Sequence, residues 1–179
     1  MRRLLRVPLI TTSTVLLVCS PFTGCSRSRA RHQEEIGPTV DVPKFSIAVR
    51  LSPAAESRLR NMGESITVLA MFDGDPLPGQ GKYNPPMRDV YLGSAEKPVN
   101  EKNEVQFDDV KIPQRDWNRL ADKNYFVTIN TFSARKVASD NLLDCADPIS
   151  VRIEAMRGKT TEVRCWLIGE THASSDGSE

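Results

Sequence analysis

The stretch from Pro148 to Ile168, PISVRIEAMRGKTTEVRCWLI, shows the clearest alternation of apolar and polar residues in the chain. Apolar residues fall at every second position on both sides of a central Arg-Gly-Lys triplet, which is typical of two strands joined by a turn. The pattern predicts a β-hairpin with these facing pairs: Ile153 and Val163, Val151 and Cys165, Ile149 and Leu167. Because a two-stranded ribbon is not stable alone, we expect the rest of the chain to supply a sheet for it to join.

Length and composition favour one β-rich domain. The chain has 179 residues, enough for a single domain with a core. Its formal net charge is +1, with 24 basic and 23 acidic residues, so it lacks the basic footprint of a nucleic-acid-binding protein. Short alternating runs separated by turn residues predict an all-β fold, an antiparallel β-sandwich of about seven strands with one or two short helices. We assign it to residues 44–169, followed by a disordered tail over residues 170–179.

Local signals place the individual elements. The alternation from Phe45 to Leu51 predicts a half-buried strand. A helix is expected to begin after Ser52, since serine at the N-cap followed by proline is a start signal, and to end at Gly63. Further strands are expected at residues 65–72, 90–93 and 125–132 and in the run from Val105 to Ile112, with one or two helical turns at residues 113–120.

The N-terminus has the pattern of an export signal. Residues 1–24 contain basic residues, a short apolar stretch and small residues before a cysteine, which predicts a secretory signal peptide. The sequence Phe22-Thr23-Gly24-Cys25 resembles the lipobox of bacterial lipoproteins, although that motif usually has an aliphatic residue where Phe22 stands. The resemblance implies that Cys25 is lipidated and becomes the N-terminal residue of the mature protein.

The residues after Cys25 predict where the protein is held. Residues 25–43 are polar and charged, and we expect them to act as a flexible tether between the lipid and the domain. By the same resemblance, Ser26 favours the outer membrane of a diderm bacterium, with the domain facing the periplasm or the cell surface. The alternative is ordinary cleavage of the signal, which would give a soluble periplasmic or secreted protein.

Two cysteines remain for the domain itself, Cys145 and Cys165. In an oxidising compartment two such residues predict a disulfide. In the chain-entropy account, closing a loop of about twenty residues stabilises the fold by roughly 3 kcal/mol. Two buried free thiols are the alternative. A metal site is not expected, because no histidine or third cysteine accompanies the pair.

The segment from Asp73 to Pro86 is rich in glycine and proline and separates two expected strands. A connection this long in a compact domain is usually functional or mobile. We predict that it is a binding loop, with Asp73, Asp75, Tyr83 and Asn84 as candidate contact residues. The alternative is a structural excursion at a sheet edge.

Histidine placement argues against most catalysis. The only histidines are His32 and His172, which flank the domain and supply it with no imidazole for a nucleophile. We expect no catalytic residues, no metal and no cofactor. Asp73, Asp75 and Asp89 could still act as acid and base or hold Ca²⁺, although their spacing matches no calcium-loop pattern. The alternative function is therefore a periplasmic hydrolase that uses carboxylates around residues 73–89, alone or with a metal.

Three segments together resemble a known sandwich family. The resemblance is to the transthyretin-like, or prealbumin-like, domain of many exported bacterial proteins. It is carried by DGDPLPG at residues 73–79, VQFDDV at 105–110 and YFVTI at 125–129. The helix expected between the first two strands departs from the pattern of that family. Hydroxyisourate hydrolases of that family depend on histidines within the domain, and nothing here corresponds to them. We expect a non-catalytic lipoprotein that contacts the membrane through its lipid and binds another envelope component, a protein or a glycan. Envelope assembly and lysozyme inhibition are further hypotheses that no residues specify.

Overall fold

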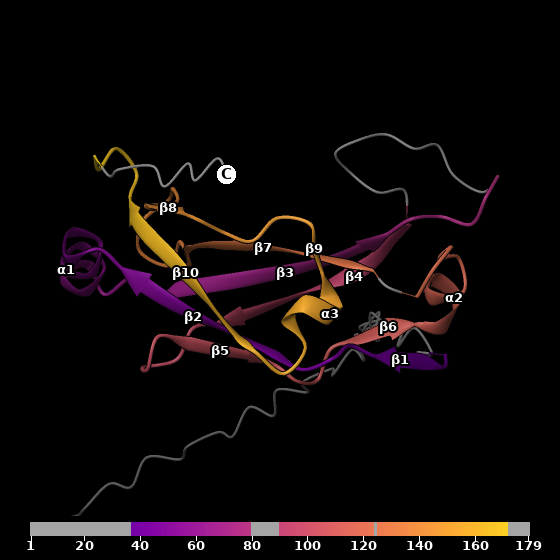
Figure 1. The fold of residues 1–179 in the computed structure, drawn as a ribbon. Coiled ribbons are helices and arrows are strands. Elements are labelled where there is room, and N and C mark those ends of the chain that lie inside the picture. Colours follow the sequence, from indigo (N-terminus) through magenta and orange to yellow (C-terminus); the bar gives the residue numbers. More distant parts are fainter. Residues whose placement is uncertain (1–36, 80–89, 124, 172–179) are drawn as a thin grey trace, which may run out of the picture. The chain divides into compact units, whose positions relative to one another are not determined.

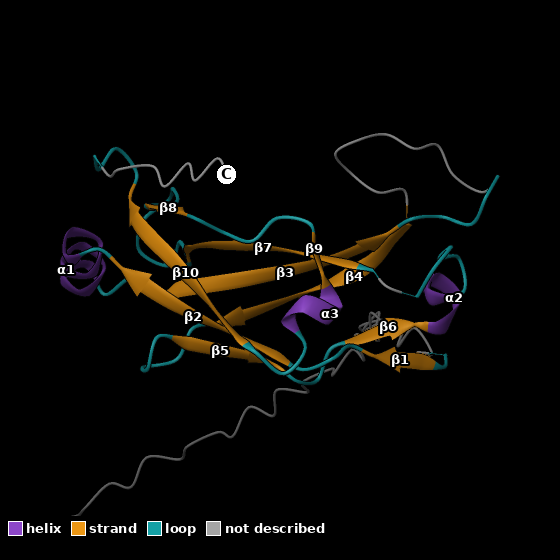
Figure 2. Cartoon of the chain, viewed as in Figure 1, coloured by secondary structure: helices purple, strands orange, loops and turns teal. Residues whose placement is uncertain are grey.

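Strands make up most of the described chain in the computed structural model, which describes residues 37–79, 90–123 and 125–171 (Figures 1 and 2). These residues belong to the compact unit formed by residues 35–179. In chain order the elements are β1 (Thr39–Asp41), β2 (Phe45–Leu51), α1 (Pro53–Met62), β3 (Ile66–Gly74), β4 (Val90–Pro98), β5 (Glu104–Phe107), β6 (Lys111–Pro113), α2 (Gln114–Trp117), β7 (Phe126–Ser133), β8 (Leu143–Cys145), β9 (Val151–Arg152), α3 (Ile153–Met156) and β10 (Thr160–Leu167).

The strands form two main sheets and one small ribbon. The first sheet, which we name the β10 sheet, has the strand order β5-β2-β10-β8, and the second, the β3 sheet, has the order β4-β3-β7-β9. The ribbon pairs β1 with β6. The predicted mostly-β, sandwich-like fold is confirmed, with three short helices among the described residues rather than one or two. A wholly antiparallel arrangement is wrong, because β2 and β10 run parallel.

Every second residue of the central strands points into a shared core. Phe45 and Ile47 of β2 are 3% and 0% exposed, and Phe72 of β3 is 0% exposed. The Phe45 ring stacks on Phe107 of β5, with centroids 4.9 Å apart, and meets the edge of Phe72 at 6.5 Å. Since Phe45 and Phe72 belong to different sheets, the two sheets pack face to face through this core.

The predicted C-terminal hairpin is wrong, and its two halves lie in different sheets. The first half ends as β9, which pairs with β7, and continues as α3. The second half is β10, which lies between β2 and β8 (Figure 1). None of the three predicted facing pairs forms: Cys165 lies opposite Cys145, and Ile149 is 74% exposed. Alternation shows which face of a strand is apolar, but it does not show which strand lies beside it. An apolar face can be buried in any sheet that has one side on the core.

Helix α1 follows its local signals and confirms the prediction. The Ser52 hydroxyl accepts a hydrogen bond from the Ala55 N–H at 3.1 Å, and Gly63 ends the helix in the left-handed conformation at φ 68°. Ala55 and Leu59 are buried, and the helix packs against β2 and β10. These end signals are local, so the sequence alone could locate the helix.

The described domain begins earlier than predicted. Residues 39–42, which we expected in the tether, pair with β6 or pack beside it: Val40 lies opposite Ile112, and Val42 is 5% exposed and donates its N–H to the Val110 carbonyl at 2.9 Å. Prolines on either side gave this segment the appearance of a linker. None of the helices in the described ranges is long and apolar enough to span a membrane.

Candidate functional site

Cys145 and Cys165 form the predicted disulfide, which is therefore confirmed. The two residues face each other on β8 and β10, with Cα atoms 4.1 Å apart. Cys165 is 1% exposed and belongs to the core. The bond consequently acts in packing, and the alternative of two free thiols is wrong.

Only the first part of the predicted binding loop lies within the described residues. Asp73 is a strand residue rather than a loop residue, because β3 continues to Gly74 and Asp73 pairs with Tyr91 and Phe126. Asp75 follows the strand, and its carbonyl accepts the Ala121 N–H at 2.9 Å. Tyr83, Asn84 and Asp89 lie outside the described residues.

The start of this connection is fixed against a second segment. A Cβ atom on Gly74 would lie 2.4 Å from Leu120 Cδ2, so a larger residue here would require the Leu120 side chain to move. Pro76 forms an isolated β-bridge with Leu120, and the Leu77 N–H donates to the Arg119 carbonyl at 2.9 Å. Residues 74–77 are therefore held by main-chain contacts and are not an open binding surface.

A groove lies beside β4, close to the point where the long connection enters that strand. It has a volume of about 370 Å³, within the usual range for ligand sites. One wall comes from β3 and β4, and the other from β6, α2 and the residue before β6. The lining residues are Phe72, Tyr91, Leu92, Gly93, Ser94, Val110, Lys111, Pro113, Arg115 and Asp116.

The floor of the groove is apolar and its rim carries an aromatic side chain. Phe72 and Leu92 lie at its base but are 0% and 1% exposed, so partly buried residues such as Val110 supply the apolar surface that a ligand could reach. Tyr91 stands between buried Val90 and Leu92 on β4 and is 58% exposed, one of the largest exposures for an apolar side chain among the described residues. A tyrosine in this position offers apolar contact area and a hydroxyl to a ligand at little entropic cost.

The opposite wall carries two cations and one carboxylate. Lys111 Nζ lies 3.4 Å from Asp41, and both side chains are more than half exposed, so this pair is weak. Asp116, whose side chain is 19% exposed, lies 3.5 Å from both Arg115 and Arg119. Counted with Asp41 and Arg119, this side of the groove has three cations and two carboxylates, a net charge of +1.

The far half of β4 is closed by a lysine. Lys97 Nζ donates to the Gln106 carbonyl of β5 at 2.9 Å and to Asp109 at 2.5 Å, and it lies 3.6 Å from Asp108. The hydrogen bond from Lys97 lowers the pKa of Asp109. A lysine bridging an edge strand in this way protects it from pairing. The half of β4 that lines the groove has no such bridge among the described residues.

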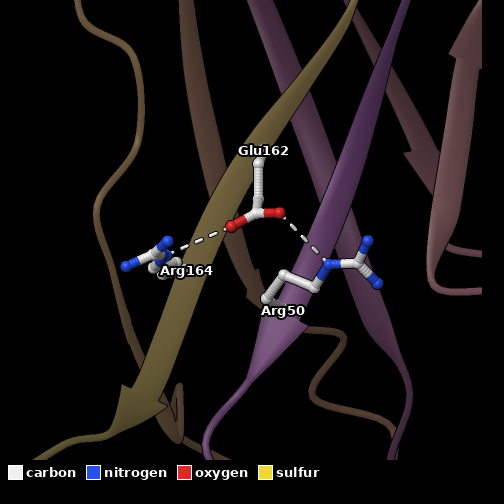
Figure 3. Close-up of polar contacts among 3 residues, drawn as sticks. All are labelled: Arg50, Glu162 and Arg164. Carbon is white, nitrogen blue, oxygen red and sulfur yellow. Dashed lines mark hydrogen bonds and ion pairs between the residues drawn. The ribbon is translucent and has the colours of Figure 1, made fainter.

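A second charged cluster lies on the outer face of the β10 sheet, away from the groove residues. Arg50 and Arg164 face each other in the parallel register of β2 and β10. The Glu162 carboxylate lies between them and accepts from their Nε atoms at 3.3 and 3.1 Å (Figure 3). All three side chains are 45–70% exposed. This carboxylate offsets the repulsion between two adjacent cations, which is a structural role.

Sequence reasoning missed the groove residues Tyr91, Lys111 and Arg115. Tyr91 and Lys111 stand between apolar neighbours and Arg115 between polar ones, patterns that predict exposure but not proximity to one another. In the part of the chain that the structure describes, no group of three or more His, Cys, Asp or Glu residues could hold a metal ion. Comparisons with protein families, with characterised proteins and with solved structures give no match for this chain.

Proposed function

We propose that this protein is an exported, lipid-anchored module that binds another component of the cell envelope, a protein or a glycan, without catalysing a reaction. The groove between β4 and the β6–α2 segment carries the proposal. It combines an apolar floor, an exposed aromatic residue and a positive wall, a combination that serves ligand binding more directly than it serves stability.

Rigid surroundings support the use of this groove as a binding site. Phe72 and Leu92 are fixed in the core, and the β1–β6 ribbon supports the opposite wall through Ile112, which is 1% exposed. A ligand would therefore meet a surface already in its binding geometry, which lowers the entropy cost of association. The working surface is then the groove beside β4, at the strand end where the long connection enters.

The proposed location depends on the N-terminal pattern, which lies outside the described residues. Phe22-Thr23-Gly24-Cys25 provides the site for lipidation, and we place the domain at the outer membrane on that basis. The Cys145–Cys165 disulfide is compatible with an oxidising compartment. Membership of the transthyretin-like family stays a proposal, and binding at the groove does not depend on it.

Photo-crosslinking from the groove tests the proposal. A benzoylphenylalanine residue replaces Tyr91 in the full-length protein expressed in its own host, and a matched protein carries the same residue at Glu101, on an exposed turn. We expect irradiation to attach an envelope protein or glycan at position 91 and not at position 101. Equal products from both positions, or none from position 91, would show that the groove is not a binding site.

A further inference from the structure

We infer that the ligand of this groove is an extended, acidic peptide segment of a partner protein, laid along the free edge of β4. The inference rests on the proposed function, whose ligand class it narrows from any envelope component to a peptide. Its three supports are the edge of β4, which pairs with β3 alone among the described strands, the open space beside Gly93 and the charge of the opposite wall.

The edge of β4 supplies main-chain partners for a peptide. β3 is the only described strand that pairs with β4, so β4 is an edge of the β3 sheet. Such edges bind extended peptides by adding a strand, with main-chain hydrogen bonds giving affinity. Lys97 bridges to Gln106 and closes the far half of this edge, which leaves the half that includes Tyr91 to Ser94.

Gly93 leaves room for a peptide backbone. The register between β3 and β4 shifts next to Phe72, and Gly93 stands at this irregularity with φ 128°. A Cβ atom built on Gly93 would meet no atom within 4 Å. A glycine inside a strand marks a bulge or a place where another backbone approaches closely, and the positive φ of Gly93 is explained by the bulge. Its lack of a side chain also leaves this part of the groove lining open.

Charge and surface chemistry favour an acidic sequence. Lys111 is 59% exposed, its partner Asp41 is 82% exposed, and solvent screens the pair, so a ligand carboxylate can compete for the ammonium group. Asp116 already faces Arg115 and Arg119. In a strand laid on β4, alternate side chains point to opposite faces, so acidic residues can face Lys111 while the residues between them point to the other face of the sheet.

Selection from a random nonapeptide library displayed on phage tests the inference. The full-length wild-type protein is compared with Lys111→Glu and Tyr91→Ala, two changes at exposed side chains, and with the control Lys102→Glu on the exposed β4–β5 turn. We expect enrichment of peptides with Asp or Glu at alternate positions and without proline at their centre. Affinity for an enriched peptide should fall by about tenfold or more in Lys111→Glu, fall in Tyr91→Ala, and stay unchanged in Lys102→Glu.

Three results would overturn the inference: no enrichment over the starting library, enrichment of basic or proline-rich peptides, or enriched peptides that bind Lys111→Glu as tightly as wild type. Unfolding curves of each variant confirm that it folds. The crosslink at position 91 separates the two proposals. A product at that position together with a failed peptide selection leaves a binding groove whose ligand is not an acidic peptide, whereas absence of the product removes both.

Discussion

Glu64 shows how one side chain holds a corner of this fold. It lies between the end of α1 and the start of β3 and is only 8% exposed. Its carboxylate accepts four main-chain N–H groups, from Ser65 at 2.9 Å, Lys136 at 3.2 Å, Val137 at 2.8 Å and Ala138 at 3.0 Å. These hydrogen bonds lower the pKa of Glu64 to about 2, and the one from the Val137 N–H has the largest effect. Burial acts in the opposite direction. The charged carboxylate therefore orders the connection between β7 and β8.

We expect Glu64→Gln to lower the melting temperature at neutral pH by several degrees, because it removes charge-assisted hydrogen bonds. Since folding lowers the pKa from 4.5 to about 2, this contribution is fully present above pH 4.5 and is lost as the pH falls through about 2. Urea unfolding of both proteins between pH 2 and 7 measures the difference, with Glu101→Gln as a surface control. If the unfolding free energies of the wild type and of Glu64→Gln differed by the same amount at every pH in this range, the assignment would be refuted.

Asp147 is the opposite case, because the fold destabilises the ionised form of its carboxyl group. Its Oδ2 accepts the Thr131 N–H at 2.8 Å, while its Oδ1 is buried without a hydrogen-bond partner among the described residues. Burial is the main cause that raises the pKa of Asp147, and the charge of Asp144 adds to it, while donors at Thr131 oppose the shift. The Thr131 hydroxyl is buried as well. The ionised carboxyl therefore reduces stability at neutral pH.

We predict that Asp147→Asn stabilises the protein at neutral pH, because the amide oxygen can still accept from Thr131 and no charge is left to desolvate. A raised pKa means that the penalty is absent below pH 3.8 and fully present once the pH exceeds the raised value. The melting temperature of Asp147→Asn should thus exceed that of wild type by a few degrees at pH 7 and converge with it at low pH. A lower melting temperature at pH 7, with Asp140→Asn neutral, would contradict this account.

At the scale of elements, residues 141–150 act as a strap across the edges of both sheets. Within the strap, β8 pairs with β10 in one sheet. Three N–H groups of β7, in the other sheet, donate to the strap: Ser133 to Asn141 Oδ1 at 2.9 Å, Thr131 to Asp147 Oδ2 at 2.8 Å and Ile129 to the Pro148 carbonyl at 2.9 Å. Because β9 is only two residues long, it pairs with only part of β7. The strap accepts hydrogen bonds from other N–H groups of β7 and so prevents another strand from pairing at this edge.

The disulfide should fix this strap in place. Cys145 and Cys165 are 20 residues apart, so the double variant Cys145→Ala/Cys165→Ala should lose about 3 kcal/mol of unfolding free energy in the chain-entropy account. Because the strap covers β7, the amides of Thr131 and Ser133 should also exchange faster, while that of Ala70 in the centre of β3 changes only with global stability. Denaturant unfolding and hydrogen exchange measure the two effects. Equal stability of the two proteins would show that the bond contributes nothing to the strap.

At the scale of the whole molecule, the sequence predicts what is decided locally. Ser52 and Gly63 locate α1 because caps act within one turn, and Cys145 and Cys165 form the disulfide expected of the two cysteines in the predicted domain. The predicted strand at residues 125–132 corresponds to β7, whose apolar density reflects burial between β3 and the strap. The mostly-β fold class could be predicted because many short alternating runs are compatible with few architectures other than packed β-sheets.

What sequence reasoning could not supply is the choice of neighbours. Val151 and Val163 carry the same alternating pattern, yet one joins β7 and the other lies beside β2. The groove could not be predicted for the same reason, since Tyr91 and Lys111 line it together only because the fold brings β4 and β6 close to each other. Which strands pair with each other depends on the packing of all strands together. No local pattern in a single sequence shows that pairing.

Attachment to a membrane is the property of the whole molecule that the N-terminal pattern predicts most specifically. If Cys25 carries lipid, Cys25→Ser must remove the anchor while leaving the disulfide between Cys145 and Cys165 intact. We expect wild-type protein to incorporate labelled palmitate and to sediment with membranes, and Cys25→Ser to do neither, because two or more acyl chains are needed for stable anchoring. Cys19→Ser is the matched control, since it removes a cysteine from the same segment without changing the motif at residues 22–25. Labelling that survives in Cys25→Ser but disappears in Cys19→Ser would move the anchor to Cys19, and labelling of neither cysteine would make the protein a soluble export product.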